Sequence, residues 1–292
     1  MNTGPVRVLL QTTIPPAADD WSVARFSLLR DLLAGAVDDD GQPLYVVEAR
    51  DRGPLGAPDP VLSRLDDSDF DQLWLMAVDV GDGLTDEDCE AISRFRETGG
   101  GLVVARDHMD LGSSVCTLGG VGAAHCFHSK NQEPDASRHV RDDEETQAIS
   151  WPNYRSGANG DYQAIRPVAP LHPVLADPAS PTGALRYLPA HPHEGAVIAP
   201  PDARVIATGQ SHTTGRGFNL AVAFEGQGTT GRAIAQSTFH HFVDYNWNLA
   251  MGSPSFVSEV PGDGMAREPQ ALADTHRYVL NVAAWLGRRR RS

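Results

Sequence analysis

The chain has 292 residues, of which 41% are hydrophobic and 21% charged, a composition typical of a globular protein with a substantial core. Its formal net charge of −14 opposes binding to nucleic acid. No run of about 18 apolar residues occurs, which excludes a membrane-spanning helix. The N-terminal segment lacks the charged-then-apolar pattern of a signal peptide, so we expect a cytoplasmic protein that does not bind membranes.

The first third of the sequence alternates between short apolar runs and amphipathic segments. The apolar runs are predicted strands at 6–10, 44–47, 73–78 and 102–105. A rough helical stripe over 21–33 predicts a first helix. A second helix is predicted to begin at the N-cap Thr85, followed by an acidic first turn, and to end at Gly99–Gly101. Continuous apolar strands separated by helices indicate a parallel sheet covered on both faces.

The segment from about 129 to 201 is rich in Pro, Asn, Asp and His and has weak periodicity. We interpret it as a long irregular insertion, and loops of this length in a compact domain are usually functional. The last third returns to strands separated by Gly- and Thr-rich turns, which suggests antiparallel additions at 203–207, 218–224 and 232–236. A helix over 271–286 closes the chain. We find no linker, so the prediction is a single α/β domain over 1–292.

Two predicted strands are followed directly by acids and histidines. Asp107 and His108 follow the fourth strand, and His240, His241 and Asp244 follow the last one. Ligands of open parallel sheets bind outside the carboxyl ends of the strands. The sequence therefore predicts a functional site at this edge of the sheet.

Two further histidine clusters lie in loops. His191, His193 and Glu194 belong to the irregular middle, and His125 and His128 fall in a Gly-rich stretch. Neutral imidazoles and carboxylates are ligands that borderline divalent metals prefer. Taken singly, each cluster also has a structural interpretation, as a core histidine, a turn cap or a shaped loop. Their joint placement favours a functional site, and His125 and His128 are second-tier candidates for it.

The segment from 153 to 162 is dense in hydrogen-bonding side chains. It is predicted either to line a pocket for a polar, sugar-sized ligand or to form a plain Asn-Gly turn. The candidate substrate-binding residues are Asn153, Tyr154, Arg155, Asn159 and Asp161.

The three cysteines are predicted to be structural. Cys89, Cys116 and Cys126 are too few for a disulfide framework, and their spacing fits no thiolate zinc site. A nucleophilic cysteine would be expected in the sharp turn directly after a strand, and none of the three lies there.

The final strand and its loop, Gln236 to His241, resemble an element of the glutamine amidotransferase-like superfamily. In amidotransferases this strand leads into a Phe-His-Pro-Glu motif whose histidine activates a cysteine from an earlier turn. Here His241 and Phe242 replace the proline and glutamate, and the expected cysteine turn corresponds to 106–108, which holds no cysteine. The resemblance implies a flavodoxin-like fold in which thioester chemistry does not carry over.

Within the superfamily, the His-Pro-hydrophobic element at 172–174 is similar to that of the trehalose-utilisation-protein-like branch. The segments 107–112, 191–195 and 239–242 look like motifs of an uncharacterised bacterial set in that superfamily. The resemblance spans most of the chain, and it implies a fold and a site position without an established reaction.

The leading hypothesis is a metal-dependent enzyme that acts on a small polar or carbohydrate-like substrate. Hydrolysis is the first reaction type that we expect, and isomerisation or oxygen chemistry would fit the same ligands. The expected cofactor is a divalent metal, zinc or iron, held by a subset of His108, His191, His193, His240 and His241, with Glu194 as a further ligand. The expected general base is Asp107, or whichever of Glu194 and Asp244 is not a ligand. Two alternatives stay open: a metal-free acid–base enzyme, and a non-catalytic ligand-binding protein that lost the amidotransferase cysteine. The sequence also leaves a homo-oligomer open.

Overall fold

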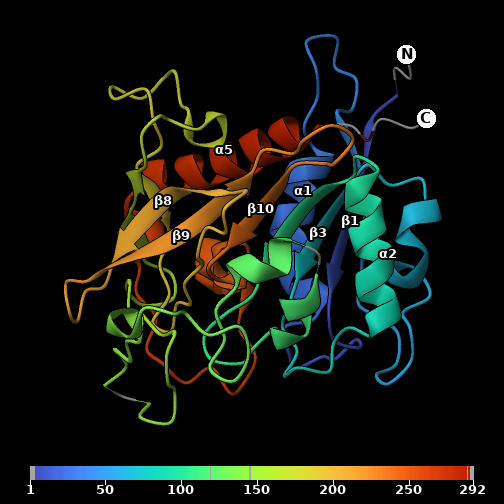
Figure 1. Cartoon of the computed structure of the whole chain (residues 1–292). Coiled ribbons are helices and arrows are strands. Elements are labelled where there is room, and N and C mark those ends of the chain that lie inside the picture. Colours follow the sequence, from blue (N-terminus) through green and yellow to red (C-terminus); the bar gives the residue numbers. More distant parts are fainter. Residues whose placement is uncertain (1–3, 119, 145, 288, 290–292) are drawn as a thin grey trace.

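The computed structural model of the chain describes residues 4–118, 120–144, 146–287 and 289. Its main sheet contains β1 (Val6–Thr12), β2 (Tyr45–Arg50), β3 (Gln72–Met76), β4 (Gly101–Ala105), β6 (Arg166–Pro167), β8 (Arg204–Gln210), β9 (Gly217–Phe224) and β10 (Ala233–Gln236). These eight strands lie in the order β2-β1-β3-β4-β10-β9-β8-β6 (Figure 1). The first five are mutually parallel, and the remaining three continue the sheet in antiparallel pairs.

The predicted fold class is confirmed by this strand order. The order 2-1-3-4 followed by a fifth parallel strand is the flavodoxin-like arrangement, with β10 in the fifth position. The prediction that β10 is an antiparallel addition is correct for its pairing with β9 and wrong for its pairing with β4, because Ala233 to Gln236 run parallel to β4. The Gly-rich turn before β10 correctly indicates an antiparallel hairpin with β9, but a hairpin turn carries no information about the strand on the other side.

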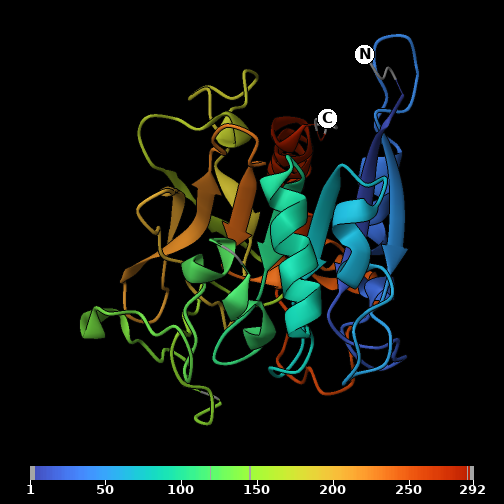
Figure 2. The ribbon, with the colours of Figure 1, turned by 45° about the vertical axis from the view of Figure 1, so that its right-hand side comes forward.

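Helices cover both faces of the sheet. The α-helices are α1 (Ser27–Ala34), α2 (Asp86–Glu97), α3 (Asp244–Trp247), α4 (Gly264–Arg267) and α5 (Pro269–Leu286). Helices α1 and α5 bury Leu29, Leu33 and Val279 in one hydrophobic cluster, while α2 buries Ile92 and Phe95 in a second cluster on the other face. Figure 2 shows α2 against its face of the sheet. This layering agrees with the continuous apolar strands of the sequence.

The starts of the two early helices differ in how far the sequence predicts them. Helix α2 begins at Asp86 with a capping box between Thr85 and Asp88, as the acidic first turn predicts. The helix expected from Trp21 begins only at Ser27, after a 3₁₀ turn at Val23–Phe26. The carboxylate of Asp244, which is far from this helix in the sequence, accepts hydrogen bonds from its first turn, and no local pattern reveals this contact.

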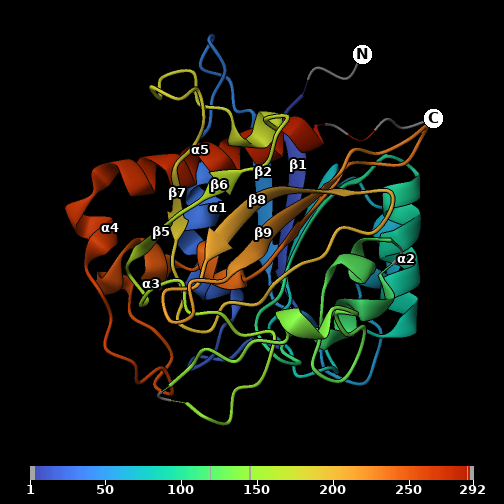
Figure 3. The same ribbon diagram turned by 60° about the vertical axis from the view of Figure 1, so that its left-hand side comes forward.

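The irregular middle of the chain contains short elements connected by loops. Strands β5 (Tyr162–Ala164) and β7 (Tyr187–Pro189) form a separate two-stranded sheet, and β6 joins the edge of the main sheet at β8. Figure 3 shows these strands beside β8, with α5 running past β7. The 3₁₀ turns of the chain are η1 (Val23–Phe26), η2 (Leu62–Asp67), η3 (Ser113–Thr117), η4 (Val121–Ala124), η5 (Ala136–Arg138), η6 (Pro173–Leu175), η7 (Phe239–His241) and η8 (Leu249–Met251). Among the described residues, no helix has the length and apolar character needed to cross a membrane.

Candidate metal centre

Asp107, His191 and His240 meet at the carboxyl edge of the sheet, and we call these three residues the Asp107 cluster. Each offers one ligand atom, and these atoms all lie within 4.8 Å of one another. Asp107 Oδ2 lies 3.4 Å from His240 Nε2, and Asp107 Oδ1 lies 3.7 Å from His191 Nδ1. All three side chains are buried. The sequence prediction that histidines and an acid gather at this edge agrees with this arrangement.

Three separate segments deliver these side chains. Asp107 follows β4 by two residues, His240 lies in η7 just after β10, and His191 lies in the loop after β7. A backbone hydrogen bond of 2.8 Å from Phe239 N to Arg106 O ties η7 to the end of β4. Because β4 and β10 are parallel neighbours, the residues that follow them lie side by side.

His108 and His193 extend the cluster on one side. His108 Nε2 lies 3.7 Å from Asp107 Oδ2. The His193 ring lies 5.6 Å from the rings of both His108 and His191, and its own partners are Glu259 Oε1 at 2.8 Å and Asp143 Oδ2 at 3.3 Å. His193 therefore forms an outer layer between the cluster and two carboxylates.

The buried charges favour an ionised carboxylate among neutral imidazoles. Burial alone would raise the pKa of Asp107, but the neighbouring His191, His108 and His240 hold that pKa well below its usual range. Burial lowers the pKa of His108 to about 4, against the opposing pull of Asp107, and burial likewise places the pKa of His191 well below its usual value. At neutral pH Asp107 is therefore ionised and His108 and His191 are neutral, which are the protonation states in which such side chains can coordinate a divalent cation.

The rings of His191 and His240 stack face to face, with centroids 3.5 Å apart and planes inclined by 16°. The edge of Trp21 packs against His240 at 4.9 Å. Imidazole lone pairs lie in the ring plane, so two parallel rings do not aim both lone pairs at one point. For both rings to bind one ion, they must turn away from this stacked arrangement.

His241 and Glu194 form a second buried network that is separate from the Asp107 cluster. His241 Nε2 lies 2.9 Å from Glu194 Oε1, and Ser237 Oγ donates to the same oxygen at 2.9 Å. Glu194 Oε2 accepts hydrogen bonds from Ser156 Oγ at 2.6 Å and Gln163 Nε2 at 2.7 Å.

On the other side of His241, Gln236 Nε2 lies 2.6 Å from Nδ1, and Tyr278 donates to Gln236 Oε1 at 2.7 Å. Both nitrogens of His241 therefore already have protein partners. The adjacent histidines His240 and His241 point into different environments, and His240 is the one that joins the cluster.

Asp244, predicted as a candidate base, is the first residue of α3, and its side chain contacts the start of α1. Its carboxylate accepts hydrogen bonds from Ser27 N at 3.0 Å, Ser27 Oγ at 2.6 Å and Leu28 N at 2.7 Å. The side chain thus satisfies the first turn of α1 and does not face the Asp107 cluster.

The two second-tier histidines also lie outside the cluster. His125 is completely buried, and burial beside Arg106 lowers its pKa to about 3. His128 is exposed to solvent.

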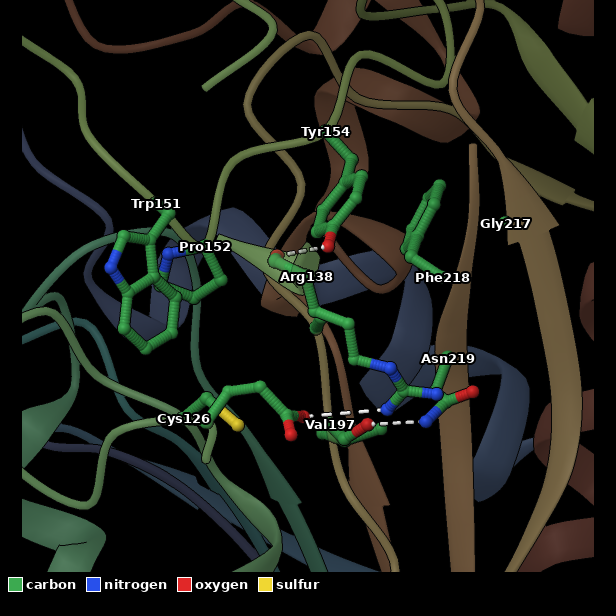
Figure 4. Close-up of a pocket in the computed structure, with 11 residues that line it drawn as sticks. Cys126, Arg138, Trp151, Pro152, Tyr154, Val197, Gly217, Phe218 and Asn219 are labelled. Atoms are coloured by element: carbon green, nitrogen blue, oxygen red, sulfur yellow. Dashed lines mark hydrogen bonds and ion pairs between the residues drawn. The ribbon is translucent and has the colours of Figure 1, made fainter. Parts of the chain in front are cut away.

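Of the candidate substrate-binding residues, Tyr154 lines a pocket. Its ring stacks on Phe218 at 4.5 Å, and its hydroxyl donates to Arg138 O at 2.6 Å. Figure 4 shows this pocket, with Trp151 on the opposite side and Arg138 between them. Tyr154 also pairs through its backbone with Glu194, so the pocket and the buried Glu194 network share one wall.

The other four candidate substrate-binding residues do not line that pocket. Asn153 is buried, and its side-chain amide has no hydrogen-bond partner among the described residues. Asp161 Oδ1 accepts from Gly264 N at 2.9 Å, and the backbone of Asn159 accepts from Gly262 N at 2.8 Å. Arg155 is half-buried. These contacts tie the segment to the chain before α4.

Residues 252–262, which we call the strap, connect η8 to α4 and lie over one side of the centre. Ser255 donates to Asp19 through its backbone at 2.6 Å and its hydroxyl at 2.5 Å. Phe256 packs edge-on against Trp21 at 6.2 Å, and Glu259 pairs with His193. No local pattern in the sequence points to Glu259, because it lies in an aperiodic loop that contains Pro and Gly.

No family model matches the sequence, and no curated protein matches it. Among solved structures, the chain is similar to the cytoplasmic protein STM3548 from Salmonella typhimurium, with 12% identity, 94% of this chain and 98% of that chain covered, and a TM-score of 0.45. It is also similar to the glutaminase domain of Trypanosoma brucei CTPS with bound acivicin, with 12% identity, 96% and 94% covered, and a TM-score of 0.46. For the mmIFT52 N-terminal domain the identity is 10%, the coverage 81% and 88%, and the TM-score 0.45. Likeness at this level assigns no activity, and the fold class rests on the strand order of the sheet itself.

Proposed function

We propose that the chain is a metal-dependent enzyme, a hydrolase in the first instance, that acts on a small polar or carbohydrate-like substrate. The observation that carries the proposal is the convergence of one ligand atom each from Asp107, His191 and His240 at a buried strand edge. Two histidines and one carboxylate are the donor set of several zinc hydrolases and of non-haem iron enzymes. Zinc or iron is therefore the proposed ion.

The separations within the Asp107 cluster fit such an ion. Ligand atoms about 2.0–2.1 Å from a tetrahedral metal lie about 3.3 Å from one another. The contacts of 3.4 Å from His240 to Asp107 Oδ2 and of 3.7 Å from His191 to Asp107 Oδ1 are close to this value. They end on different oxygens, so an ion would be held by both carboxylate oxygens or by one of them after a small shift of the side chains. His108, at 3.7 Å from Asp107, is the next donor available. The stacked imidazoles must turn apart, which is the main rearrangement that binding requires.

When bound, the metal would supply a Lewis acid that polarises a carbonyl or activates water. The chain itself would hold the ion through the Asp107 cluster and limit water entry through the strap and Trp21. Glu194 and Asp244 are engaged in other contacts, so neither is retained as the proposed base.

A metal-free acid–base enzyme is the second candidate, and the stacking of His191 on His240 favours it. The His191 imidazole, whose pKa burial places well below its usual value, stacks on His240 at 3.5 Å beside the ionised Asp107. In that case Asp107 would orient His240 through the 3.4 Å contact, as a carboxylate orients a catalytic imidazole. Activity that survives chelation would support this candidate.

Elemental analysis of protein purified without a metal-binding tag tests the proposal. We expect near-stoichiometric zinc or iron in the native chain and its loss in His240→Ala. His128→Ala is the matched control, because His128 is an exposed histidine outside the cluster, and it should keep the metal. Absence of metal from the native chain, even after incubation with zinc and ferrous ions, would overturn the proposal and leave the acid–base candidate.

A further inference from the structure

One hydroxyl joins two members of the Asp107 cluster. Thr238 is completely buried at the N-cap of η7. Its Oγ1 donates to Asp107 Oδ1 at 3.0 Å and accepts a hydrogen bond from His240 N at 3.1 Å. The position of the His240 backbone is thereby coupled directly to the carboxylate of Asp107.

The side-chain amide of Asn246 joins the segment that carries His240 to the segment that carries His191. Asn246, in α3, is also completely buried. Its Nδ2 donates to His240 O at 3.0 Å and to Ala190 O at 3.2 Å. Ala190 directly precedes His191, so this amide connects the η7 segment to the loop that carries His191.

We propose that Thr238 and Asn246 are positioning residues of the Asp107 cluster. Together they connect the ends of β4 and β10 with the loop after β7, three segments that are far apart in sequence. Partners that orient metal ligands typically account for 10- to 100-fold in metal affinity when they are removed. The inference rests on the proposed function, because it takes the Asp107 cluster as the working site.

The chain provides a matched control for each residue. Thr275 is a buried threonine whose hydroxyl donates to Ala271 O at 2.8 Å within α5. Asn281 resembles Asn246 in donating from Nδ2 to two carbonyl oxygens, those of Val174 at 3.2 Å and Ala176 at 2.8 Å. Neither control side chain hydrogen-bonds to the Asp107 cluster. Its replacement therefore measures how the loss of a hydrogen bond elsewhere in the fold affects stability and metal binding.

The first experiment is a cobalt(II) titration of the full chain, read from the visible absorption of the bound ion. We expect Thr238→Val to weaken cobalt binding about 10- to 100-fold and to alter the absorption bands. Thr238→Ser keeps the hydroxyl and should restore both. Thr275→Val should bind like the native chain even if its melting temperature falls by a similar amount. Equal affinities in Thr238→Val and Thr275→Val would overturn the role of Thr238.

Asn246→Leu and Asn281→Leu form the second pair, and this pair carries the test if Thr238→Val does not fold. Weaker cobalt binding in Asn246→Leu alone supports the inference. Equal binding in the two folded variants contradicts it.

A readout on the metal-free chain separates this inference from the proposed function. The amide of His240 should exchange with solvent deuterium faster in Thr238→Val than in the native chain or Thr238→Ser, as followed by nuclear magnetic resonance. A native chain that binds no metal overturns the proposed function, yet faster exchange still supports the positioning role. Unchanged exchange at His240 overturns the positioning role whether or not metal binds.

Discussion

His241 Nε2 lies 2.9 Å from Glu194 Oε1, and neither side chain has exposed surface. The contact joins the segment after β10 to the loop after β7. Neighbouring side chains provide hydrogen-bond partners for the remaining polar atoms of the pair. A histidine and an acid in direct contact invite a catalytic interpretation. Their complete burial and full set of protein partners indicate a structural role instead.

Replacing Glu194 with Ala should destabilise the fold without removing the metal. Removing this carboxylate leaves its buried hydrogen-bond partners without an acceptor, at a cost of about 1–3 kcal/mol for each group left unsatisfied. Chemical denaturation measures this change in the free energy of unfolding, and elemental analysis measures the metal. Loss of metal at unchanged stability would instead place Glu194 among the ligands.

Asp244→Ala should lower stability through the start of α1. The carboxylate accepts hydrogen bonds from Ser27 N and Leu28 N, which have no partners within the helix. Loss of a helix cap costs about 1–2 kcal/mol. We expect a lower melting temperature with metal content unchanged, and a variant of native stability would contradict the capping role.

The sequence predicts the sheet, and it predicts at which edge of the sheet the candidate site residues lie, because both depend on local patterns. Apolar runs mark the strands, and the residues that follow β4 and β10 must share one edge of a parallel sheet. It could not separate His240 from His241, since adjacent residues in a turn face different environments that only tertiary packing defines. It also overlooked Thr238 and Asn246, because a buried hydroxyl or amide has the same local sequence signal whatever its partner.

The stability of the chain should depend on Asp59 in acid. Burial alone would raise the pKa of Asp59, but hydrogen bonds from Arg50 and from the amides of Leu62, Gly53 and Val61 lower that pKa from 3.8 to about 2. The folded state therefore keeps this carboxylate ionised where the unfolded state already takes up a proton. The resulting stabilisation, about 2 kcal/mol, is present above pH 3.8 and disappears as the pH falls towards about 2.

Comparison with Asp59→Asn tests this pH dependence. The variant should be less stable than the native chain by about 2 kcal/mol near neutral pH, and the difference should shrink below about pH 4. Urea denaturation across this range gives both free energies of unfolding. A difference that stays constant down to about pH 3 would show that the Asp59 carboxylate does not contribute in this way.

The strap should open more readily when Glu259 loses its charge. Glu259 Oε1 contacts His193 Nε2 at 2.8 Å. Elsewhere the strap is held by the two hydrogen bonds from Ser255 to Asp19 and, at its ends, by hydrogen bonds from Arg25 to Gly252 O and from Gly262 N to Asn159 O. Glu259→Gln should weaken this anchor by about 1 kcal/mol, which corresponds to about fivefold in the opening equilibrium. Hydrogen exchange of residues 253–260, followed by mass spectrometry, should accelerate by that factor.

Glu225→Gln is the matched control, because Glu225 is also a partly exposed carboxylate that pairs with a buried histidine, His172, at 3.3 Å. Glu225 directly follows β9 and His172 is the N-cap of η6, so neither belongs to the strap, and loss of this pair should leave exchange in 253–260 unchanged. If the native chain binds metal, Glu259→Gln should also release it to a chelator faster, since the strap lies over His193 beside the Asp107 cluster. Equal exchange in the two variants would mean that the remaining contacts of the strap hold it closed, and that the contact of Glu259 with His193 does not limit access to the centre.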